Sequence, residues 1–216
     1  MFWHIFRGIA PNAIAIFRPS VLIWHALAML LTAALVLSGA DWWFYEATRY
    51  GALTPLIWFA GLSFYIYIVF VPLAIYLLGE WRKDESLKRK AGLLLQAIIL
   101  GALLSGVYKA FTGRIEPPFM YIGTEDVSRV FQFGFWRHGV FWGWPSSHTT
   151  VTVAAAIACV QLFRSHTVSV IAVTYAASVA IGAAIGFHWL SDVLAGLIFG
   201  TLIGFVVTRK GPDLLK

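Results

Sequence analysis

Six long apolar stretches with few charges restrict what this chain can fold into. They lie at about 20–39, 54–79, 91–110, 148–163, 167–187 and 189–207. A helix needs about 20 mostly apolar residues to cross a bilayer, so each stretch is long enough, or nearly so, for one crossing. Of the 216 residues, 60% are hydrophobic and 12% are charged, against about 45–50% apolar in soluble domains. The sequence therefore predicts an all-α polytopic membrane protein with six transmembrane helices in one bundle.

The whole chain is expected to form one membrane domain. Its expected parts are an interfacial helix at 1–19, the six-helix bundle at 20–207 and a cytoplasmic tail at 208–216. The first part holds Arg7 and Arg18 among aromatic residues, and no clean apolar core leads to a cleavage site, which argues against a signal peptide. An amphipathic helix in the membrane interface fits better. The run Asp41–Trp43, which opens the first outer loop, is expected at the interface too, with Glu46 solvated.

Most basic residues fall on one side of the predicted membrane. Eleven of the sixteen do so: Arg7, Arg18, Arg82, Lys83, Lys88, Arg89, Lys90, Arg164, Arg209, Lys210 and Lys216. Cytoplasmic loops carry an excess of Lys and Arg, so this side is predicted to be cytoplasmic. The net charge of +6 then follows from topology, and no nucleic-acid partner is expected.

The remaining basic residues lie where this rule disfavours them: Arg49, Lys109, Arg114, Arg129 and Arg137. Four of the five come between Lys109 and His148, among many aromatic residues. Aromatic rings anchor at bilayer interfaces, but the positive charge needs another reason. An anionic ligand on the outer face provides one.

Two histidines flank the fourth and fifth predicted crossings. His148 begins this region and His188 ends it. A hairpin of two crossings returns the chain to the face where it started, so both imidazoles are predicted at one face. Lys109 ends the third stretch at that face as well. Ionisable groups are costly to place at a membrane boundary and are usually functional.

His188 and Asp192 are four residues apart at the start of the last stretch, so they share one helix face. A carboxylate there accepts a hydrogen bond from one ring nitrogen and leaves the other as a nucleophile. A buried pair that only pins the helix end is the alternative.

The run Trp144-Pro145-Ser146-Ser147-His148 begins the fourth stretch. Proline followed by two serines is a strong signal for a helix N-terminus, and the free N–H groups there bind phosphate-like anions. His148 is placed to donate a proton to a leaving oxygen. An ordinary capped helix with an interfacial histidine is the alternative.

Lys109 and Arg114 leave the third stretch together, with Gly113 between them. A lysine and an arginine so placed can clamp a phosphoryl group. Snorkelling of both side chains to the headgroups is the alternative.

In these motifs the sequence resembles the type 2 phosphatidic acid phosphatase superfamily, the membrane relatives of vanadium haloperoxidases. The family carries a Lys–Arg-Pro motif, a Pro-Ser-Gly-His motif and a Ser-Arg, His, Asp motif. WPSSH matches the second, with Ser147 in place of the glycine, and GFHWLSDVLAG matches the end of the third. The resemblance covers about 50–207 and is specific over 109–196. It implies a six-helix core, no metal ion and no cofactor, and dephosphorylation of lipid phosphates through a phosphohistidine.

The resemblance also implies roles for individual residues. His188 would be the nucleophile that attacks phosphorus, with Asp192 as its orienting carboxylate. His148 would be the general acid that protonates the leaving alcohol. Three groups would hold the phosphoryl oxygens, where preorganised positive charge stabilises the transition state: Lys109, Ser146 and the amide of Ser147.

Two family arginines are absent from their expected positions. Where the family has Arg-Pro this chain has Glu116-Pro117, and where it has the other arginine this chain has Gly182. Arg114, two residues early, is the best substitute for the first, and Arg137 is a candidate for the second. Two neighbours are weaker candidates: His138, and Arg129, which is expected at the surface.

These residues predict a membrane lipid phosphate phosphatase whose site faces the extracytoplasmic side of a bacterial inner membrane. It would hydrolyse a phosphomonoester or a pyrophosphate on a lipid. Substrates consistent with this are phosphatidic acid, phosphatidylglycerophosphate, undecaprenyl pyrophosphate or a phosphorylated lipid A. The bilayer and the lipid phosphate are the expected partners, while the lipid's identity and the oligomeric state stay open.

Three alternatives remain. A lipid phosphotransferase would use the same histidine but pass the phosphoryl group to another lipid. A non-catalytic lipid-phosphate binder would explain Glu116 and Gly182, although both catalytic histidines are retained. A haem-binding membrane protein could use His148 and His188 as axial ligands, but haem would not require the adjacent Asp and Lys.

Overall fold

The computed structural model describes residues 8–49, 51, 54–118 and 125–209. Within these residues the regular elements are helices, and β-structure is limited to an isolated bridge between Arg114 and Phe131. The elements are α2 (Ile9–Ile16), η1 (Pro19–Val21), α3 (Leu22–Ser38), α4 (Ala40–Thr48), α5 (Thr54–Arg82), α6 (Glu85–Thr112), α7 (Ser147–Phe163), α8 (His166–Gly186) and α9 (Leu190–Arg209). The predicted all-α fold is confirmed.

Among the described residues, five helical segments are long and apolar enough to cross a membrane. They are Pro19–Ser38, Thr54–Arg82, Glu85–Thr112, His166–Gly186 and Leu190–Arg209. The sixth apolar helix, α7, is shorter at 17 residues. Each of these helices coincides with one of the six apolar stretches, so the predicted helical membrane bundle is confirmed.

The helix ends differ from the apolar limits in one informative place. The third stretch was expected from residue 91, but α6 begins at Glu85. The Asp84 carboxylate accepts hydrogen bonds from the backbone N–H groups of Ser86 and Leu87, at 2.8 and 3.1 Å. This N-cap lets the helix start among charged residues before the apolar part is reached.

The N-terminal segment is described only from residue 8. Helix α2 falls inside the expected interfacial segment and packs against α9 and α6. Residues 1–7 and the tail from residue 210 lie outside the described residues, so the domain limits at both ends stay predictions. The connection between α3 and α5 contains a nine-residue helix, α4.

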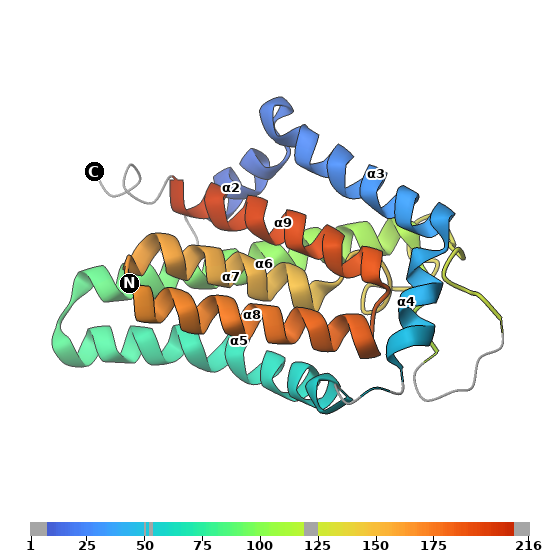
Figure 1. The fold of residues 1–216 in the computed structure, drawn as a ribbon. Helices are drawn as coiled ribbons and strands as arrows, with labels where there is room; N and C mark the ends of the chain where they lie inside the picture. The colour runs from blue at the N-terminus through green and yellow to red at the C-terminus, as the bar shows by residue number, and fades with distance from the viewer. Residues whose placement is uncertain (1–7, 50, 52–53, 119–124, 210–216) are drawn as a thin grey trace.

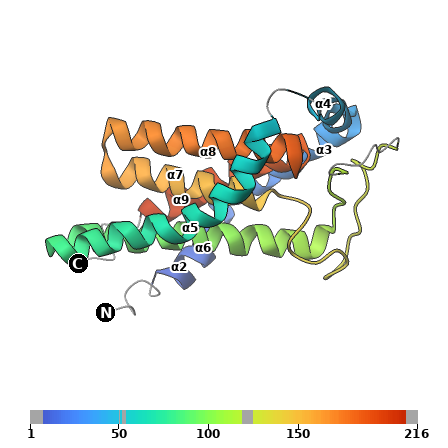
Figure 2. The ribbon, with the colours of Figure 1, turned by 90° about the horizontal axis from the view of Figure 1, so that it is seen from below.

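The long helices lie side by side, and α7 is surrounded by α6, α8 and α9 (Figure 1). Helix α5 covers α6 and α8, while α3 lies against α9. Helix α4 and the segments 113–118 and 125–146 gather at one end of the bundle, where α6 ends and α7 and α9 begin (Figures 1 and 2). The α5–α6 and α7–α8 turns lie at the other end.

Small residues allow α7 and α9 to approach closely. A Cβ atom on Gly200 would lie 2.7 Å from the carbonyl oxygen of Thr150, and one on Gly196 would lie 2.9 Å from Cβ of Thr149. Interfaces between membrane helices favour such small residues because the backbones can then pack directly. The contact fixes the start of α7 against the start of α9.

Candidate active site

Four predicted site residues come together at this end of the bundle. Lys109 lies in the last turn of α6, His148 in the first turn of α7, His188 between α8 and α9, and Asp192 in the first turn of α9. The two imidazole rings meet edge to face, with centroids 5.9 Å apart. The hairpin topology read from the sequence therefore does bring both histidines to one place.

His188 is held in a buried turn. Its backbone N–H donates to the carbonyl of Ala183 at 2.9 Å, and 2% of the residue is exposed. Its Nδ1 lies 3.5 Å from Oδ2 of Asp192, an ion-pair distance that is long for a hydrogen bond. Burial lowers the pKa of His188 below its ordinary value, although Asp192 acts in the opposite direction. The ring is therefore neutral at neutral pH, as a nitrogen nucleophile must be.

Asp192 connects this turn to the other parts of the site. Its Oδ2 accepts the backbone N–H of Trp189 at 3.1 Å, and its Oδ1 accepts an N–H of Arg114. Its backbone carbonyl accepts the N–H of Ser146 at 3.0 Å. The start of α9 is thereby tied directly to the start of α7.

Ser146 caps α7, as the sequence predicts. Its Oγ accepts the backbone N–H of Thr149 at 3.3 Å. The Ser147 hydroxyl is hydrogen-bonded to the Ser105 hydroxyl of α6 at 2.9 Å, so the backbone N–H of Ser147 is the group it can offer an anion. The first N–H groups of a helix have no partner within the helix, and they favour an anion there.

The His148 ring is fixed by aromatic contacts. Its centroid lies 4.5 Å from that of Phe64 and 5.5 Å from that of Phe187, which is nearly parallel to it. Its buried Nδ1 has no hydrogen-bond partner among the described residues. Packing therefore sets the orientation of this ring and leaves its Nδ1 for a ligand.

Lys109 is a buried cation, with 1% of the residue exposed. Its Nζ donates to the carbonyl of Phe141 at 3.0 Å, which leaves two of its three N–H groups for other acceptors. The ammonium group is within electrostatic reach of both histidines and of Asp192. A buried ammonium group usually has an anionic partner, and a bound phosphoryl group would be one.

Arg114 has a different set of partners from the one expected of a phosphate ligand. Its Nη1 donates to Ser191 Oγ and to Asp192, its Nη2 donates to Asp41 and to the carbonyl of Ser128, and its Nε donates to the same carbonyl. A guanidinium has five N–H groups, and all five are used within the protein. In this structure Arg114 positions Asp192 and has no N–H group left for phosphate.

Asp41 of α4 is the site residue that the sequence reasoning missed. It was expected at the interface, but it is fully buried. One carboxylate oxygen accepts the backbone N–H of Ser191 at 2.8 Å, and the other accepts the Ser191 hydroxyl and Arg114, both at 2.6 Å. The available signal was an acidic residue at the end of an apolar stretch, on the same face as Arg114 and Asp192.

Other predicted residues lie farther from the histidines. Arg137 is exposed in the segment 125–146, and no contact joins it to His148, His188 or Lys109 among the described residues. Glu116 pairs with His138, with 2.8 Å between Oε2 and Nε2. Arg129 lies on the surface as expected, 3.9 Å from Asp126.

The packing of Gly182 explains why no arginine occupies that position. A Cβ atom there would lie 2.7 Å from Cβ of Ala60 and would press on the carbonyl of Leu56, both on α5. The space that a side chain would need is filled by a neighbouring helix. Among the described residues, no group of three or more His, Cys, Asp and Glu side chains is placed to hold a metal ion.

The fold and the site together define a helical membrane protein with two histidines, an aspartate and a buried lysine gathered at one end of its bundle. A family model described as the PAP2 superfamily matches residues 90–215. The chain belongs to this superfamily, and the resemblance seen in the sequence is confirmed. This membership supports a membrane phosphatase that acts on lipid phosphates.

No curated protein matches the chain. Among solved structures, it is similar to a crystal structure of a transmembrane PAP2 type phosphatidylglycerolphosphate phosphatase from Bacillus subtilis, at 22% sequence identity. That match covers 99% of this chain and 96% of the other, with a TM-score of 0.43.

Proposed function

We propose that the protein removes a phosphoryl group from a membrane lipid through a phosphohistidine formed on His188. The observation that carries the proposal is the contact of the His148 and His188 rings, 5.9 Å between centroids, beside Asp192 and the buried ammonium of Lys109. This set supplies a nucleophile, a proton donor and a positive charge around one space.

In the first step the free ring nitrogen of neutral His188 attacks phosphorus. The bond between phosphorus and the lipid oxygen breaks, and His148, which is protonated when the anionic phosphate is bound beside it, gives its proton to that oxygen. Asp192 faces the other ring nitrogen and stabilises the positive charge that develops on the ring. The products of this step are the dephosphorylated lipid and a phosphoryl group on His188.

In the second step a water molecule attacks the phosphohistidine. His148, now neutral, accepts a proton from the water, while the bond between nitrogen and phosphorus breaks. Phosphate leaves, and both histidines return to their starting states. Lys109 and the N-terminus of α7 would stabilise the equatorial oxygens in both transition states, where charge is greatest.

Positive charge in the site would come from fewer arginines than in the family pattern. Arg114 is committed to Asp41 and Asp192, so Lys109 and the α7 N-terminus would carry most of the phosphate binding. Arg137 is the remaining candidate for a second cation, which would reach the lipid headgroup from the exposed segment.

The first experiment measures phosphate release from a panel of lipid phosphates by the purified chain, with and without a chelator. His188→Ala should abolish release, whereas His166→Ala should not, because His166 is exposed at the start of α8. A labelled phosphoenzyme that is acid-labile and alkali-stable should be trapped in the wild type and be absent in His188→Ala. Full activity of His188→Ala would remove the mechanism.

A second experiment separates hydrolysis from phosphoryl transfer. Both reactions share the first step and differ only in the acceptor of the second. Thin-layer analysis with a donor lipid phosphate and a second acceptor lipid should give free phosphate as the main product. A phosphorylated acceptor as the main product would assign a phosphotransferase instead.

The site is further proposed to face the extracytoplasmic side of a bacterial inner membrane, because the basic residues at the other end follow the positive-inside rule. Arg137→Cys and Arg82→Cys would report the two faces, since both positions are exposed. The native Cys159 is buried and serves as the background. In intact cells an impermeant maleimide should label Arg137→Cys alone, and labelling of Arg82→Cys alone would reverse the orientation.

A further inference from the structure

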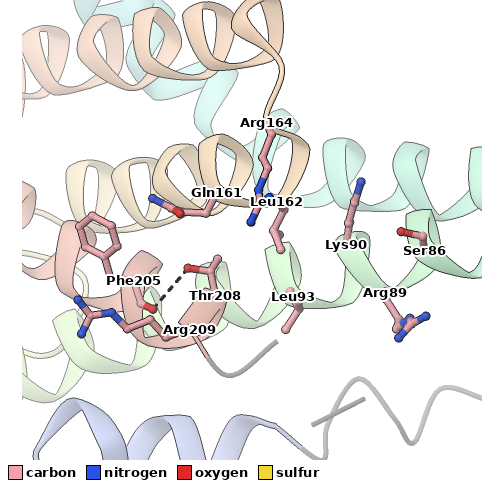
Figure 3. A pocket seen from close by; sticks show the side chains of 10 residues that line it. All are labelled: Ser86, Arg89, Lys90, Leu93, Gln161, Leu162, Arg164, Phe205, Thr208 and Arg209. Atoms are coloured by element: carbon pink, nitrogen blue, oxygen red, sulfur yellow. Dashed lines mark hydrogen bonds between the residues drawn. The ribbon is translucent and has the colours of Figure 1, made fainter. Parts of the chain in front are cut away.

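A basic pocket lies at the opposite end of the three helices that carry the active site. It has a volume of about 500 Å³ and is formed by α6, α7 and α9 (Figure 3). Its four cationic side chains are Arg89, Lys90, Arg164 and Arg209. Among the described residues, the lining contains no Asp or Glu.

The pocket is separated from the active site by the thickness of a membrane. Lys90 and Lys109 both belong to α6 and are 19 residues apart. At a rise of about 1.5 Å per residue this gives about 28 Å along the helix, close to the roughly 30 Å of a hydrocarbon core. The pocket is therefore a second site and not an extension of the first.

The acidic side chains of the α5–α6 hairpin, at the same end of the bundle, are already engaged elsewhere. In the α5–α6 hairpin, Glu80 and Glu85 both pair with Lys88, the first at 3.2 Å. Asp84 is used as the N-cap of α6. In the described part of the chain, no carboxylate pairs with the four cations of the pocket, so their charge is left for an external anion.

The rest of the described lining mixes apolar and polar side chains, namely Leu93, Leu162 and Phe205 with Ser86, Gln161 and Thr208. Lys90 lies over the Phe163 ring at 5.0 Å and Arg209 over the Phe205 ring at 5.8 Å, measured to the ring centroids. Leu93 and Leu162, both partly buried, complete the apolar lining. The polar side chains can hydrogen-bond a phosphate group, and the apolar ones give the glycerol and the upper acyl chains of a lipid a surface on which to pack.

Helix dipoles explain only part of the arrangement. Arg164 and Arg209 lie at the C-terminal ends of α7 and α9, where cations are favourable. Arg89 and Lys90 lie near the N-terminal end of α6, where the dipole gives them no such support. Both pairs nevertheless line the same pocket, so helix dipoles alone do not account for its positive charge.

We propose that this pocket binds the phosphate headgroup of an anionic phospholipid from the leaflet opposite to the active site. Basic pockets between membrane helices on the cytoplasmic side bind such headgroups by this charge pattern. The assignment does not depend on the catalytic mechanism, because none of its residues belongs to the histidine site.

The test compares lipid retention by two double variants of the full chain. Native mass spectrometry in a neutral detergent would measure bound phosphatidylglycerol against phosphatidylcholine. Arg164→Gln with Arg209→Gln should lower phosphatidylglycerol retention about tenfold or more, since each basic residue near such a surface adds appreciable affinity. Arg82→Gln with Lys83→Gln removes the same charge next to the pocket without touching its lining, and should retain the lipid.

The outcomes separate the sources of the anion. Both double variants should release phosphate from a water-soluble phosphomonoester as fast as the wild type does. This result would also show that they are folded. Equal loss of phosphatidylglycerol in the two double variants would overturn the proposal in favour of general charge attraction. Retention of phosphatidylcholine by the wild type at the level of phosphatidylglycerol would overturn it too. Displacement of the lipid by millimolar inorganic phosphate would show a free-ion site and overturn the lipid assignment.

Discussion

Arg114 and Asp192 form an ion pair in which neither side chain is exposed to solvent. The same guanidinium also pairs with Asp41, which is equally buried, at 2.6 Å. One cation therefore compensates two carboxylates, and one of these carboxylates faces the proposed nucleophile. The position of His188 thus depends on α4, an element distant in sequence that makes no contribution to the family motifs.

Removing Arg114 should destabilise the fold as well as the site. Arg114→Ala leaves two buried carboxylates without their cation, a change that costs about 3–5 kcal/mol when one partner of a buried pair is removed. We expect a marked fall in the thermal unfolding temperature in detergent and loss of phosphate release. Arg114→Lys should recover part of the stability, because an ammonium keeps the charge but lacks the planar fork.

The same variants distinguish positioning from direct phosphate binding. If Arg114 bound phosphate, Arg114→Lys would keep the unfolding temperature and mainly raise KM and the inhibition constant for inorganic phosphate. The network of five hydrogen bonds predicts the opposite order, with stability and kcat affected more than KM.

Asp41 should act as a positioning residue for Asp192. Asp41→Asn keeps the size of the side chain but replaces a charged acceptor of Arg114 and Ser191, a loss of about 1.5–3 kcal/mol for such a hydrogen bond. We expect kcat to fall about tenfold or more with little change in KM, because no substrate contact is removed. Steady-state kinetics on a lipid phosphate measures the split.

Glu46→Gln on the same helix provides the matched control. Glu46 is partly exposed and pairs with Arg49 at 3.0 Å, and an exposed ion pair is worth about 0–1 kcal/mol. Its kinetics should match the wild type. A similar loss in both variants would mean that α4 as a whole, and not the Asp41 carboxylate, supports activity.

The sequence predicted the meeting of the two histidines because topology alone determines it. Two crossings between His148 and His188 must return the chain to the same face, whatever the packing. Lys109 and Asp192 follow from the same reasoning, because each lies at a helix end at that face. Periodicity and apolar length were sufficient for these conclusions.

The partners of Arg114 could not be predicted in this way. Asp41 is 73 residues away from it and Asp192 is 78 residues away, and no local spacing records which of several buried groups a guanidinium will meet. Likewise, the pattern shows that an arginine is absent at Gly182 but not that α5 fills the space. Both depend on side-chain packing between helices that are far apart in the chain.

Restoring the family arginine at position 182 should not restore a phosphate ligand. The position faces Ala60 and the backbone of Leu56 on α5, and overpacking of a close contact costs about 1–3 kcal/mol or more. Even Gly182→Ala should therefore lower the unfolding temperature. Gly106→Ala on α6 is the control, because a Cβ atom there meets nothing within 4 Å. Equal unfolding temperatures for the two alanine variants would contradict this account of the missing arginine.

Arg137 should contribute through its charge and not through a fixed contact. It is exposed, so Arg137→Ala is expected to raise KM for a lipid phosphate a few-fold at low salt with little effect on kcat. The difference should shrink as ionic strength rises, since salt screens exposed charges over about 10 Å at 0.1 M. Arg129→Ala removes a similar surface charge in the same segment and serves as the control. If both variants raise KM equally, Arg137 contributes only to general electrostatic attraction.

The loss of rate caused by removing His148 should be larger for a poorer leaving group. Without a proton donor, a lipid alcohol must leave as an alkoxide, whereas p-nitrophenolate leaves unaided. His148→Asn should therefore slow phosphate release from a lipid phosphate about 10²–10⁴-fold, yet preserve most of the initial burst of p-nitrophenol from its phosphate ester. The burst isolates the first step, because His148 acts as a base in the second. His188→Ala should abolish both the p-nitrophenol burst and phosphate release from the lipid, since the nucleophile itself is gone. An equal fall for both leaving groups in His148→Asn would assign this ring to binding, and the T-shaped contact with His188 would then serve to orient the nucleophile.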